Sequence, residues 1–332
     1  QSRLVSFNKG KWLCEQGPFA EKRFAKLPEH DWTLLVQSVN HHLQEASDLL
    51  QQFSFIPHAR LDDLMVSYAP DGGGVGPHFD SYDVFLLQGL GQRLWRISEQ
   101  ADLDLVEGAP LRILKNFETK QEWTLSAGDM LYLPPHLAHW GIAVGECMTY
   151  SVGFRVPRSA ELASELLMGL SEEMTEDHGS ASDLLYQDPH QAAAIQDASV
   201  PKALQEFAAQ SVAKALKDPQ ILNCLLGESL TEPKPNVWFD APDFDDLPSF
   251  EWPAQVRLDR RTKMLFDAKH IFINGESFRA AGKDAKLLRK LANEKTLSKA
   301  LAAQLSDNAA ELMQAWWEEG WWHCEASSAP SA

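Results

Sequence analysis

The spacing of apolar residues predicts that the first part of the chain is mainly helical. In residues 1–60, apolar side chains recur every three or four positions, which places them on one face of a helix. They are Leu35, Val39, Leu43, Ala46, Leu50 and Phe53. Asp31 precedes this run, and aspartate is a favoured residue at a helix N-cap. We therefore expect leading helices whose apolar stripe packs into a core.

Residues 63–156 show a different pattern, in which short apolar runs alternate with Gly, Pro and Asp turns. Such runs predict strands. We expect strands at 64–68, 84–87, 94–97, 123–125, 130–133 and 148–156. The second and third are predicted to be separate strands that meet at the turn Gly89-Leu90-Gly91. Many short strands of this kind favour a double-sheet jelly roll, the architecture of cupins.

From residue 157 the chain becomes rich in alanine and leucine at helical spacing. We predict helices at 159–174, 201–216 and 219–225, with Pro201 in a first turn, where proline is tolerated. Apolar faces on helices outside the barrel need a partner. That partner is either another copy of the chain or the chain's own barrel.

Residues 231–253 contain five prolines, Pro233, Pro235, Pro242, Pro248 and Pro253, and predict a linker. Beyond it we expect strands at 263–266 and 271–273, and Asn274-Gly275 is a strong hairpin signal. Helices are predicted at 284–293, 297–305 and 309–318. The tryptophans that flank Gly320, namely Trp316, Trp317, Trp321 and Trp322, are expected in the core of this last domain.

Composition narrows the class of protein. A length of 332 residues suggests two or three domains. The formal net charge of −17 argues against non-specific nucleic-acid binding, which needs a cationic surface. It would attract a basic partner over a distance, or simply maintain solubility. The four cysteines, Cys14, Cys147, Cys224 and Cys324, lack zinc-site spacing and suggest a reducing cytoplasm. No apolar run is long enough to span a bilayer.

A possible metal site lies between Gly72 and Trp140. Side chains two residues apart on a strand point to the same side, so His78 and Asp80 can contact one ion. His139 follows a Gly-Asp turn, a predicted strand and a Pro-Pro corner, and His136 is the competing third ligand. Two imidazoles and one carboxylate, with other positions open, form the ligand set of non-haem Fe(II) oxygenases.

Arg93 immediately precedes the predicted strand at 94–97. It shares a face with Trp95 and Ile97, and an arginine on an apolar inward face needs an anion, since an unpaired buried charge is costly. A dicarboxylate co-substrate would supply one, because guanidinium binds carboxylate through two parallel hydrogen bonds. A structural ion pair with an Asp or Glu of the chain would serve equally well. The pattern alone leaves both interpretations open.

Together these residues resemble a known family. The set His78-x-Asp80, Arg93 and His139, followed by the segment 150–155 and preceded by Asp62-Asp63-Leu64-Met65, is similar to the bacterial ribosomal oxygenases of the YcfD and RoxA type. These are JmjC-type, cupin-fold hydroxylases that depend on 2-oxoglutarate. The resemblance extends over essentially the whole chain, and family members carry a further N-terminal segment, so we expect the sequence to be truncated.

The resemblance implies an α+β protein. A JmjC/cupin catalytic domain with leading helices would occupy residues 1–156, and a helical dimerisation segment residues 157–230. A linker at 231–253 would precede a winged-helix-like domain at 254–332. The helices of that domain are not strongly basic, so we expect it to contact protein or to act as a scaffold rather than to bind DNA.

The resemblance also implies the chemistry. Fe(II) would bind His78, Asp80 and His139, with 2-oxoglutarate and dioxygen as co-substrates. Arg93 would bind the distal carboxylate of 2-oxoglutarate, and Ser67 would add a hydrogen bond. The substrate would be an arginine side chain, hydroxylated at its β-carbon, of the basic large-subunit ribosomal protein numbered sixteen, and the enzyme would be a cytoplasmic homodimer.

The residues expected to hold that cationic side chain are Asp71, Tyr82 and Ser151. Each has a plainer interpretation, as a turn former, a core tyrosine and a strand serine respectively. Three alternative functions stay open. One is a JmjC hydroxylase or demethylase of another residue, such as histidine or lysine. Another is a non-catalytic adaptor that binds a ribosomal or nucleic-acid partner. The third, a cupin isomerase with a different metal, is disfavoured by Asp80 and by the apolar setting of Arg93.

Overall fold

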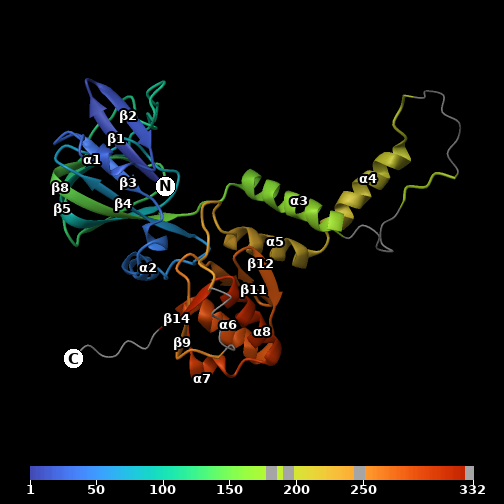
Figure 1. The fold of residues 1–332 in the computed structure, drawn as a ribbon. Helices are drawn as coiled ribbons and strands as arrows, with labels where there is room; N and C mark the ends of the chain where they lie inside the picture. Colours follow the sequence, from blue (N-terminus) through green and yellow to red (C-terminus); the bar gives the residue numbers. More distant parts are fainter. Residues whose placement is uncertain (177–184, 190–197, 243–250, 326–332) are drawn as a thin grey trace. The chain divides into compact units, whose positions relative to one another are not determined.

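The computed structural model describes residues 1–176, 185–189, 198–242 and 251–325. The chain divides into two compact units, Gln1–Val156 and Pro157–Ala332. Figure 1 shows the strands of the first unit and the helices and small sheets of the second. Within the described residues, no helix is both long and apolar enough to cross a membrane. All four cysteines lie in the described part and are free thiols.

The first unit is an antiparallel sheet that wraps around an interior, as in a jelly roll. Its strands are β1 (Ser2–Asn8), β2 (Lys11–Gln16), β3 (Trp32–Val36), β4 (Leu61–Ala69), β5 (Val84–Ser98), β6 (Gln121–Ser126), β7 (Met130–Leu133) and β8 (Ala138–Phe154). They pair in the order β2-β1-β3-β4-β8-β5-β6, and β7 pairs with β5. The predicted strands at 64–68, 123–125 and 130–133 are confirmed within this sheet.

The prediction of mainly helical structure in residues 1–60 was wrong. Helix there is confined to α1 (Glu21–Phe24), a 3-10 turn (Val39–His41) and α2 (Gln44–Gln51), while β1, β2 and β3 occupy the rest. Leu35 lies in β3 and pairs with Ser67 of β4, so long-range strand pairing overrides the local helical spacing. Asp31 is not an N-cap, because it has a φ of 62° and precedes β3.

The predicted turn at Gly89-Leu90-Gly91 was also wrong, because β5 continues through it as one strand. The register between β5 and β8 shifts around Leu90, so the glycines lie in a bulged region. A Cβ added to Gly91 would lie 2.0 Å from the carbonyl oxygen of Glu146 on β8. The glycines therefore permit a close approach of two long strands, whereas the sequence alone suggested a chain reversal.

The second unit begins with three helices, α3 (Ser159–Glu176), α4 (Lys202–Ala215) and α5 (Pro219–Thr231), which confirms the helices predicted in this region. Pro201 is the N-cap of α4. Pro219 is the first residue of α5, and the side chain of the preceding Asp218 caps this helix by accepting a hydrogen bond from the backbone N–H of Gln220. Two three-stranded sheets follow, β10-β11-β12 and β13-β9-β14. Their strands are β9 (Gln255–Leu258), β10 (Met264–Phe266), β11 (His270–Ile273), β12 (Glu276–Arg279), β13 (Thr296–Ser298) and β14 (Trp322–Glu325).

Three further helices complete this unit, namely α6 (Gly282–Glu294), α7 (Lys299–Ala302) and α8 (Asp307–Glu318). The hairpin turn at Asn274-Gly275 is confirmed between β11 and β12, with both residues at positive φ. The helix predicted at 297–305 is shorter, because Leu297 lies in β13. Trp316, Trp321 and Trp322 are buried, and Trp317 packs against them, so the tryptophans are core residues as predicted.

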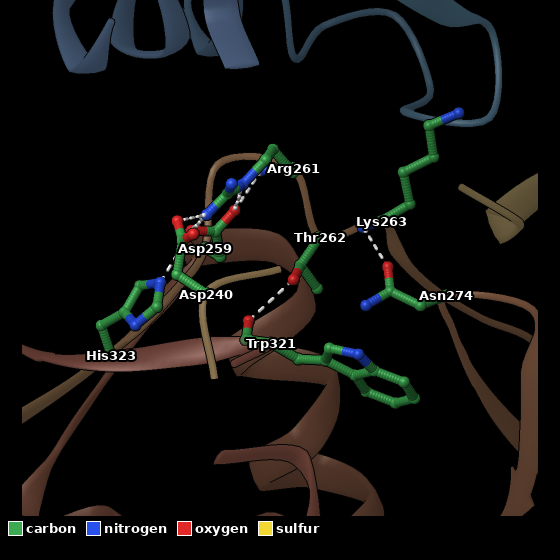
Figure 2. Close-up of polar contacts among 8 residues, drawn as sticks. All are labelled: Asp240, Asp259, Arg261, Thr262, Lys263, Asn274, Trp321 and His323. Atoms are coloured by element: carbon green, nitrogen blue, oxygen red, sulfur yellow. Dashed lines mark hydrogen bonds and ion pairs between the residues drawn. The ribbon is translucent and has the colours of Figure 1, made fainter. Parts of the chain in front are cut away.

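One residue of the predicted linker, Asp240, joins a polar cluster that surrounds the buried Asp259 (Figure 2). Arg261 donates hydrogen bonds to both carboxylate oxygens of Asp259 and to Asp240. His323 contacts the same Asp259 carboxylate at 2.7 Å. Asp240 belongs to the segment predicted as a linker, so its contact with Arg261 connects that segment to the residues before β10, while residues 243–250 lie outside the described part.

Candidate active site

The structure brings His78, Asp80 and His139 together in the first unit. His78 and Asp80 lie between β4 and β5, and His139 lies near the start of β8. The backbones of the two histidines form an antiparallel bridge, with N–H···O distances of 2.9 and 2.8 Å. One ligand atom from each of the three side chains lies within 4.8 Å of the others. Three such groups from distant parts of the chain could contact one metal ion.

Both imidazoles are oriented for metal binding. Nδ1 of His78 lies 2.9 Å from the carbonyl oxygen of Gly76, and Nδ1 of His139 lies 2.9 Å from that of Leu137. A carbonyl oxygen only accepts hydrogen bonds, so Nδ1 is the donor in each ring. Nε2 then keeps its lone pair, as a metal-ligating histidine requires. The side chains present therefore fit a His-Asp-His metal ion site.

His139 is kept neutral by its surroundings. It is only 3% exposed, and burial together with the neighbouring His78 lowers the pKa of His139 to about 3. A metal binds the neutral imidazole, because a proton on Nε2 would compete for the same lone pair. His136, the competing ligand, is exposed, packs its ring against Phe79 and lies outside the three-residue group.

A cavity of about 510 Å³ opens beside these three residues. It is lined from β4, β5 and β8 and from the segment that carries His78 and Asp80. The polar and charged residues in its wall include Arg3, Asp62, Asp63, Ser67, Tyr82, Arg93, Thr149 and Ser151. The cavity therefore contains the candidate metal ligands and most of the polar residues that the sequence analysis singled out.

Arg93 lines this cavity without a counter-ion. It is 4% exposed, Nη2 donates to the Cys147 sulfur at 3.4 Å, and Nε has no hydrogen-bond partner. No carboxylate of the described residues forms an ion pair with it. The structural ion pair that the sequence left open is thus not observed there, and a buried guanidinium facing a cavity is suited to an anionic ligand.

Polar groups near Arg93 form a short chain of hydrogen bonds. Ser67 is buried in the cavity wall, and its hydroxyl donates to the carbonyl oxygen of Thr149 at 3.4 Å. The Thr149 hydroxyl donates to the side-chain oxygen of Gln88 at 2.9 Å. Ser67 and Arg93 both line the same cavity. Thr149 and Gln88 were not identified from the sequence.

The three expected substrate contacts differ in position. Tyr82 and Ser151 line the cavity. Burial, followed by the charges of Asp80, Asp63 and Asp62, raises the pKa of Tyr82, so its hydroxyl stays protonated. Asp71 does not line the cavity, and its carboxylate accepts a hydrogen bond from the backbone N–H of Gly145. This position matches the plainer interpretation of Asp71 as a turn former.

Asp63 is a candidate residue that the sequence analysis did not single out. It is 8% exposed and lines the cavity on the same side of β4 as Met65 and Ser67. One carboxylate oxygen accepts hydrogen bonds from the backbone and hydroxyl of Ser38, at 2.7 and 3.0 Å. The period-two spacing to Ser67 was a signal that could have revealed it. Its neighbour Asp62 pairs instead with Arg155 at 3.3 Å.

Comparisons with known proteins agree with this geometry. A family model described as a JmjC domain matches residues 48–162, which include all three candidate ligands. A second, described as a ROXA-like winged helix, matches residues 214–323. This match begins well before the predicted boundary at residue 254. It includes α5, whose Gly227 is packed so closely on Phe272 of β11 that no Cβ would fit.

Two curated relatives match about half of the chain. Ribosomal protein uL16 3-hydroxylase of Escherichia coli is 44% identical over 170 residues, covering 49% of this chain and 43% of the relative. A probable ribosomal oxygenase of Haemophilus influenzae is 40% identical over 173 residues, covering 51% of this chain and 42% of the relative. The matched segments therefore span less than half the length of these relatives.

Solved structures match over a longer range. A structure of Escherichia coli YcfD has a TM-score of 0.82 and 28% identity, covering 98% of this chain and 87% of that one. A structure of the same ribosomal oxygenase with cobalt and 2-oxoglutarate has a TM-score of 0.78 and 29% identity, covering 98% and 86%. The chain therefore contains a JmjC domain followed by a ROXA-like winged helix, and it shares its fold with the ribosomal oxygenase YcfD of Escherichia coli.

Proposed function

We propose that this protein is an Fe(II)- and 2-oxoglutarate-dependent oxygenase that hydroxylates an arginine side chain of ribosomal protein uL16 at its β-carbon. The observation that carries the proposal is that one cavity contains the His-Asp-His group, the buried Arg93 without a counter-ion and the buried carboxylate of Asp63. The choice of uL16 as substrate is supported by the similarity to the ribosomal protein uL16 3-hydroxylase of Escherichia coli.

The metal ligands and Arg93 have separate roles in the proposed reaction. His78, Asp80 and His139 hold the metal, and Arg93 binds the distal carboxylate of 2-oxoglutarate with support from Ser67. Bound Fe(II) would couple the oxidative decarboxylation of 2-oxoglutarate by dioxygen, which gives succinate and carbon dioxide, to the insertion of the second oxygen atom into a C–H bond of the substrate. The cavity wall orients the target carbon and limits the access of water.

The Asp63 carboxylate in the cavity wall is suited to bind a cation. Asp63 and Ser67 are four residues apart on β4, which corresponds to roughly 13 Å along a strand. The second carboxylate oxygen of Asp63 faces Gly153, and a Cβ added there would lie 3.7 Å from it. The missing side chain leaves room beside the carboxylate. We propose that a guanidinium binds here, with the Tyr82 and Ser151 hydroxyls as further contacts.

The charge of the whole chain supports a basic partner. A net charge of −17 would attract a basic ribosomal protein over a distance and raise its rate of association. This steering should weaken as salt screens the charges. The same field would favour lysine-rich and histidine-containing peptides, so it supports a cationic substrate without selecting arginine.

A second candidate reaction comes from a more distant relative. A protein of Dictyostelium discoideum named bifunctional lysine-specific demethylase and histidyl-hydroxylase NO66 is 28% identical over 136 residues. Hydroxylation of histidine or demethylation of lysine would use the same metal and co-substrate. The buried Asp63 carboxylate favours the permanently charged arginine over histidine, whose imidazole is mostly neutral near pH 7.

The test uses uL16 peptides that differ only at the target residue. Purified protein is incubated anaerobically with Fe(II), 2-oxoglutarate and peptide, exposed to air and analysed by mass spectrometry. Gain of one oxygen on the arginine peptide, absent from its lysine and histidine versions, supports arginine hydroxylation. Oxygen on histidine, or loss of a methyl group from methylated lysine, would move the protein to the second candidate. No turnover with any peptide would favour a binding adaptor.

We also propose that the protein is a homodimer through its first helical segment, as the family resemblance implies. α3 exposes Leu167 and Met168, and α4 exposes Val212, so both helices present apolar side chains without cover in the described residues. Light scattering on the wild type and on Met168→Glu tests this. A wild-type mass near 37 kDa rather than twice that value would argue against a dimer.

A further inference from the structure

Two residues in the cavity wall each have a buried side-chain nitrogen without a hydrogen-bond partner. Among the described residues, Nε of Arg93 and Nε1 of Trp95 are both buried and lack a hydrogen-bond acceptor. They belong to residues two positions apart on β5, which places both side chains on the same face. Both residues line the cavity that contains His78, Asp80 and His139. Such groups are uncommon in folded proteins, because burial without a partner is unfavourable.

The indole of Trp95 is held in place on several sides. Its ring centre is 6.0 Å from that of His139, and the Arg93 guanidinium carbon is 5.9 Å from the indole centre. A Cβ added to Gly141, its partner on β8, would lie 2.7 Å from the ring. Trp95 is 5% exposed, so the N–H has little access to bulk solvent.

We propose that Nε1 of Trp95 is a second hydrogen-bond donor to the 2-oxoglutarate carboxylate that Arg93 binds. This inference rests on the proposed function for the identity of the ligand. Because Nη2 of Arg93 already donates to the Cys147 sulfur, the guanidinium has fewer free N–H groups for a ligand. A carboxylate has two oxygens with several lone pairs and can accept from both residues at once. The strand thus supplies one charged and one neutral donor.

A purely structural role for Trp95 makes a different prediction. Its ring packs with Val84, Leu86 and Leu133 in an apolar cluster. If packing were its only role, Trp95→Phe would alter stability and would affect all ligands of the cavity alike. If the N–H binds a carboxylate, the loss should be confined to ligands that carry the distal carboxylate.

The first measurement follows the indole N–H groups by nuclear magnetic resonance. Protein labelled with ¹⁵N and loaded with Zn(II), in place of iron, is titrated with 2-oxoglutarate. We expect the Trp95 indole resonance, assigned by triple-resonance experiments and by its absence from Trp95→Phe, to shift downfield as the ligand binds. An unmoved Trp95 resonance at saturating 2-oxoglutarate would overturn the inference. Because the shift is measured on wild-type protein, it does not depend on the folding of a variant.

The second measurement compares affinities by calorimetry. Trp95→Phe should weaken 2-oxoglutarate binding by about tenfold or more, as expected for losing a hydrogen bond to a charged group. Its affinity for 2-oxobutanoate, which lacks the distal carboxylate, should stay within about twofold by the same reasoning. Trp123→Phe is the matched control, because Trp123 pairs with Trp95 across β5 and β6 but is 42% exposed. Equal losses for both ligands in Trp95→Phe would favour the packing role.

These outcomes separate the inference from the proposed function. If wild-type protein with Zn(II) binds no 2-oxoglutarate, the proposed function fails and this inference fails with it. If wild-type protein binds 2-oxoglutarate but Trp95 neither shifts nor contributes affinity, only the inference fails.

Discussion

His78 and His139 are joined by a pair of backbone hydrogen bonds, and their ring centres lie 4.2 Å apart. The bridge connects a segment before β5 to the start of β8, so two of the three proposed ligands are placed by the main chain. Nδ1 of each ring is in turn fixed by a carbonyl two residues earlier. Hydrogen bonds to the main chain therefore fix both the positions and the ring orientations of these two histidines.

Because the main chain positions the two histidines, we predict that the variants His78→Ala, Asp80→Ala and His139→Ala still fold. Each of them should reduce succinate formation to background. The backbone bridge does not depend on the side chains, so the strands should still pair. Succinate release and bound metal are measured together with thermal unfolding of each variant. Normal turnover in any one of them would remove that residue from the proposed triad.

His136→Ala is the matched control for these variants. His136 lies three residues from His139, but its ring is exposed and packs on Phe79. We expect activity and metal content close to those of the wild type. If His136→Ala lost its metal while His139→Ala kept it, the assignment of the third ligand would have to be reversed.

Because Arg93 has no counter-ion, we predict that its removal weakens the binding of 2-oxoglutarate without lowering the stability of the ligand-free protein. Arg93→Met should raise the KM for 2-oxoglutarate by about 10- to 100-fold, because hydrogen bonds to a charged group contribute about 1.5–3 kcal/mol. It should also leave the ligand-free protein as stable or more stable, because a buried charge without a counter-ion is removed. Kinetics at varied 2-oxoglutarate and thermal unfolding without ligand provide the two measurements.

Arg93→Lys is the comparison for this prediction. An ammonium group keeps the charge but lacks the planar fork of guanidinium, so it should recover only part of the affinity for 2-oxoglutarate. Unchanged co-substrate dependence in Arg93→Met, together with a clear loss of stability, would favour a structural role for Arg93.

The residues that could be predicted from the sequence are those whose geometry is local. His78 and Asp80 are two residues apart, and Arg93 and Trp95 follow the same rule on β5, so a period of two was sufficient. Asp63 shares this spacing with Ser67 on β4, but its burial in the cavity wall depends on how β4 pairs with β8, which the spacing does not give. Asp71 is close along the chain to the glycine loop, but its carboxylate does not line the cavity, because sequence proximity does not fix the direction of a side chain.

The errors in the fold have a similar origin. Leu35 and Val39 are four residues apart, which fits a helix, yet β3 is held by long-range hydrogen bonds to β1 and β4. The close approach of Gly91 to Glu146 likewise depends on β8, which lies some fifty residues further along the chain. The Asn274-Gly275 turn was predictable because both glycine and asparagine tolerate positive φ, a property of the residues themselves.

The Asp63 carboxylate in the cavity wall predicts that the protein discriminates between substrates by charge. Wild-type protein should hydroxylate an arginine peptide much faster than the same peptide with citrulline, which has similar shape but no charge. Asp63→Asn should reduce this ratio by roughly tenfold or more, because it removes the charged acceptor. Its amide oxygen can still accept the hydrogen bonds from Ser38, so the local fold should persist. The ratio is obtained from competition between the two peptides, followed by mass spectrometry.

Asp71→Asn is the matched control for Asp63→Asn. Asp71 is also acidic and close in sequence, but it lies outside the cavity wall and its carboxylate accepts a hydrogen bond from the backbone N–H of Gly145. We expect it to retain the wild-type ratio of arginine to citrulline. Loss of the ratio in Asp71→Asn, with retention in Asp63→Asn, would restore Asp71 as the substrate contact expected from the sequence.

The Asp259 cluster predicts how the stability of the second unit depends on pH (Figure 2). Burial alone would raise the pKa of Asp259, but hydrogen bonds from Arg261 and His323 outweigh it and hold that pKa below its ordinary value of 3.8. A carboxyl with a depressed pKa in the folded state contributes stability above its unfolded pKa, and loses it as the pH falls further. Asp259→Asn should therefore cost about 3–5 kcal/mol at neutral pH, as expected for breaking a buried ion pair.

This cost should shrink as the pH falls below about 3.8, where the unfolded wild-type carboxyl binds a proton that the folded one resists. Asp240→Asn is the control, because Asp240 also pairs with Arg261 but its side chain is 72% exposed. An exposed pair contributes about 0–1 kcal/mol, so this variant should show a small cost with little dependence on pH. Urea unfolding of the wild type, Asp259→Asn and Asp240→Asn between pH 2.5 and 7 is followed by tryptophan fluorescence. It measures the loss of stability in each variant and the dependence of that loss on pH. A cost for Asp259→Asn that stays constant over this range would mean that the carboxylate charge does not stabilise the fold.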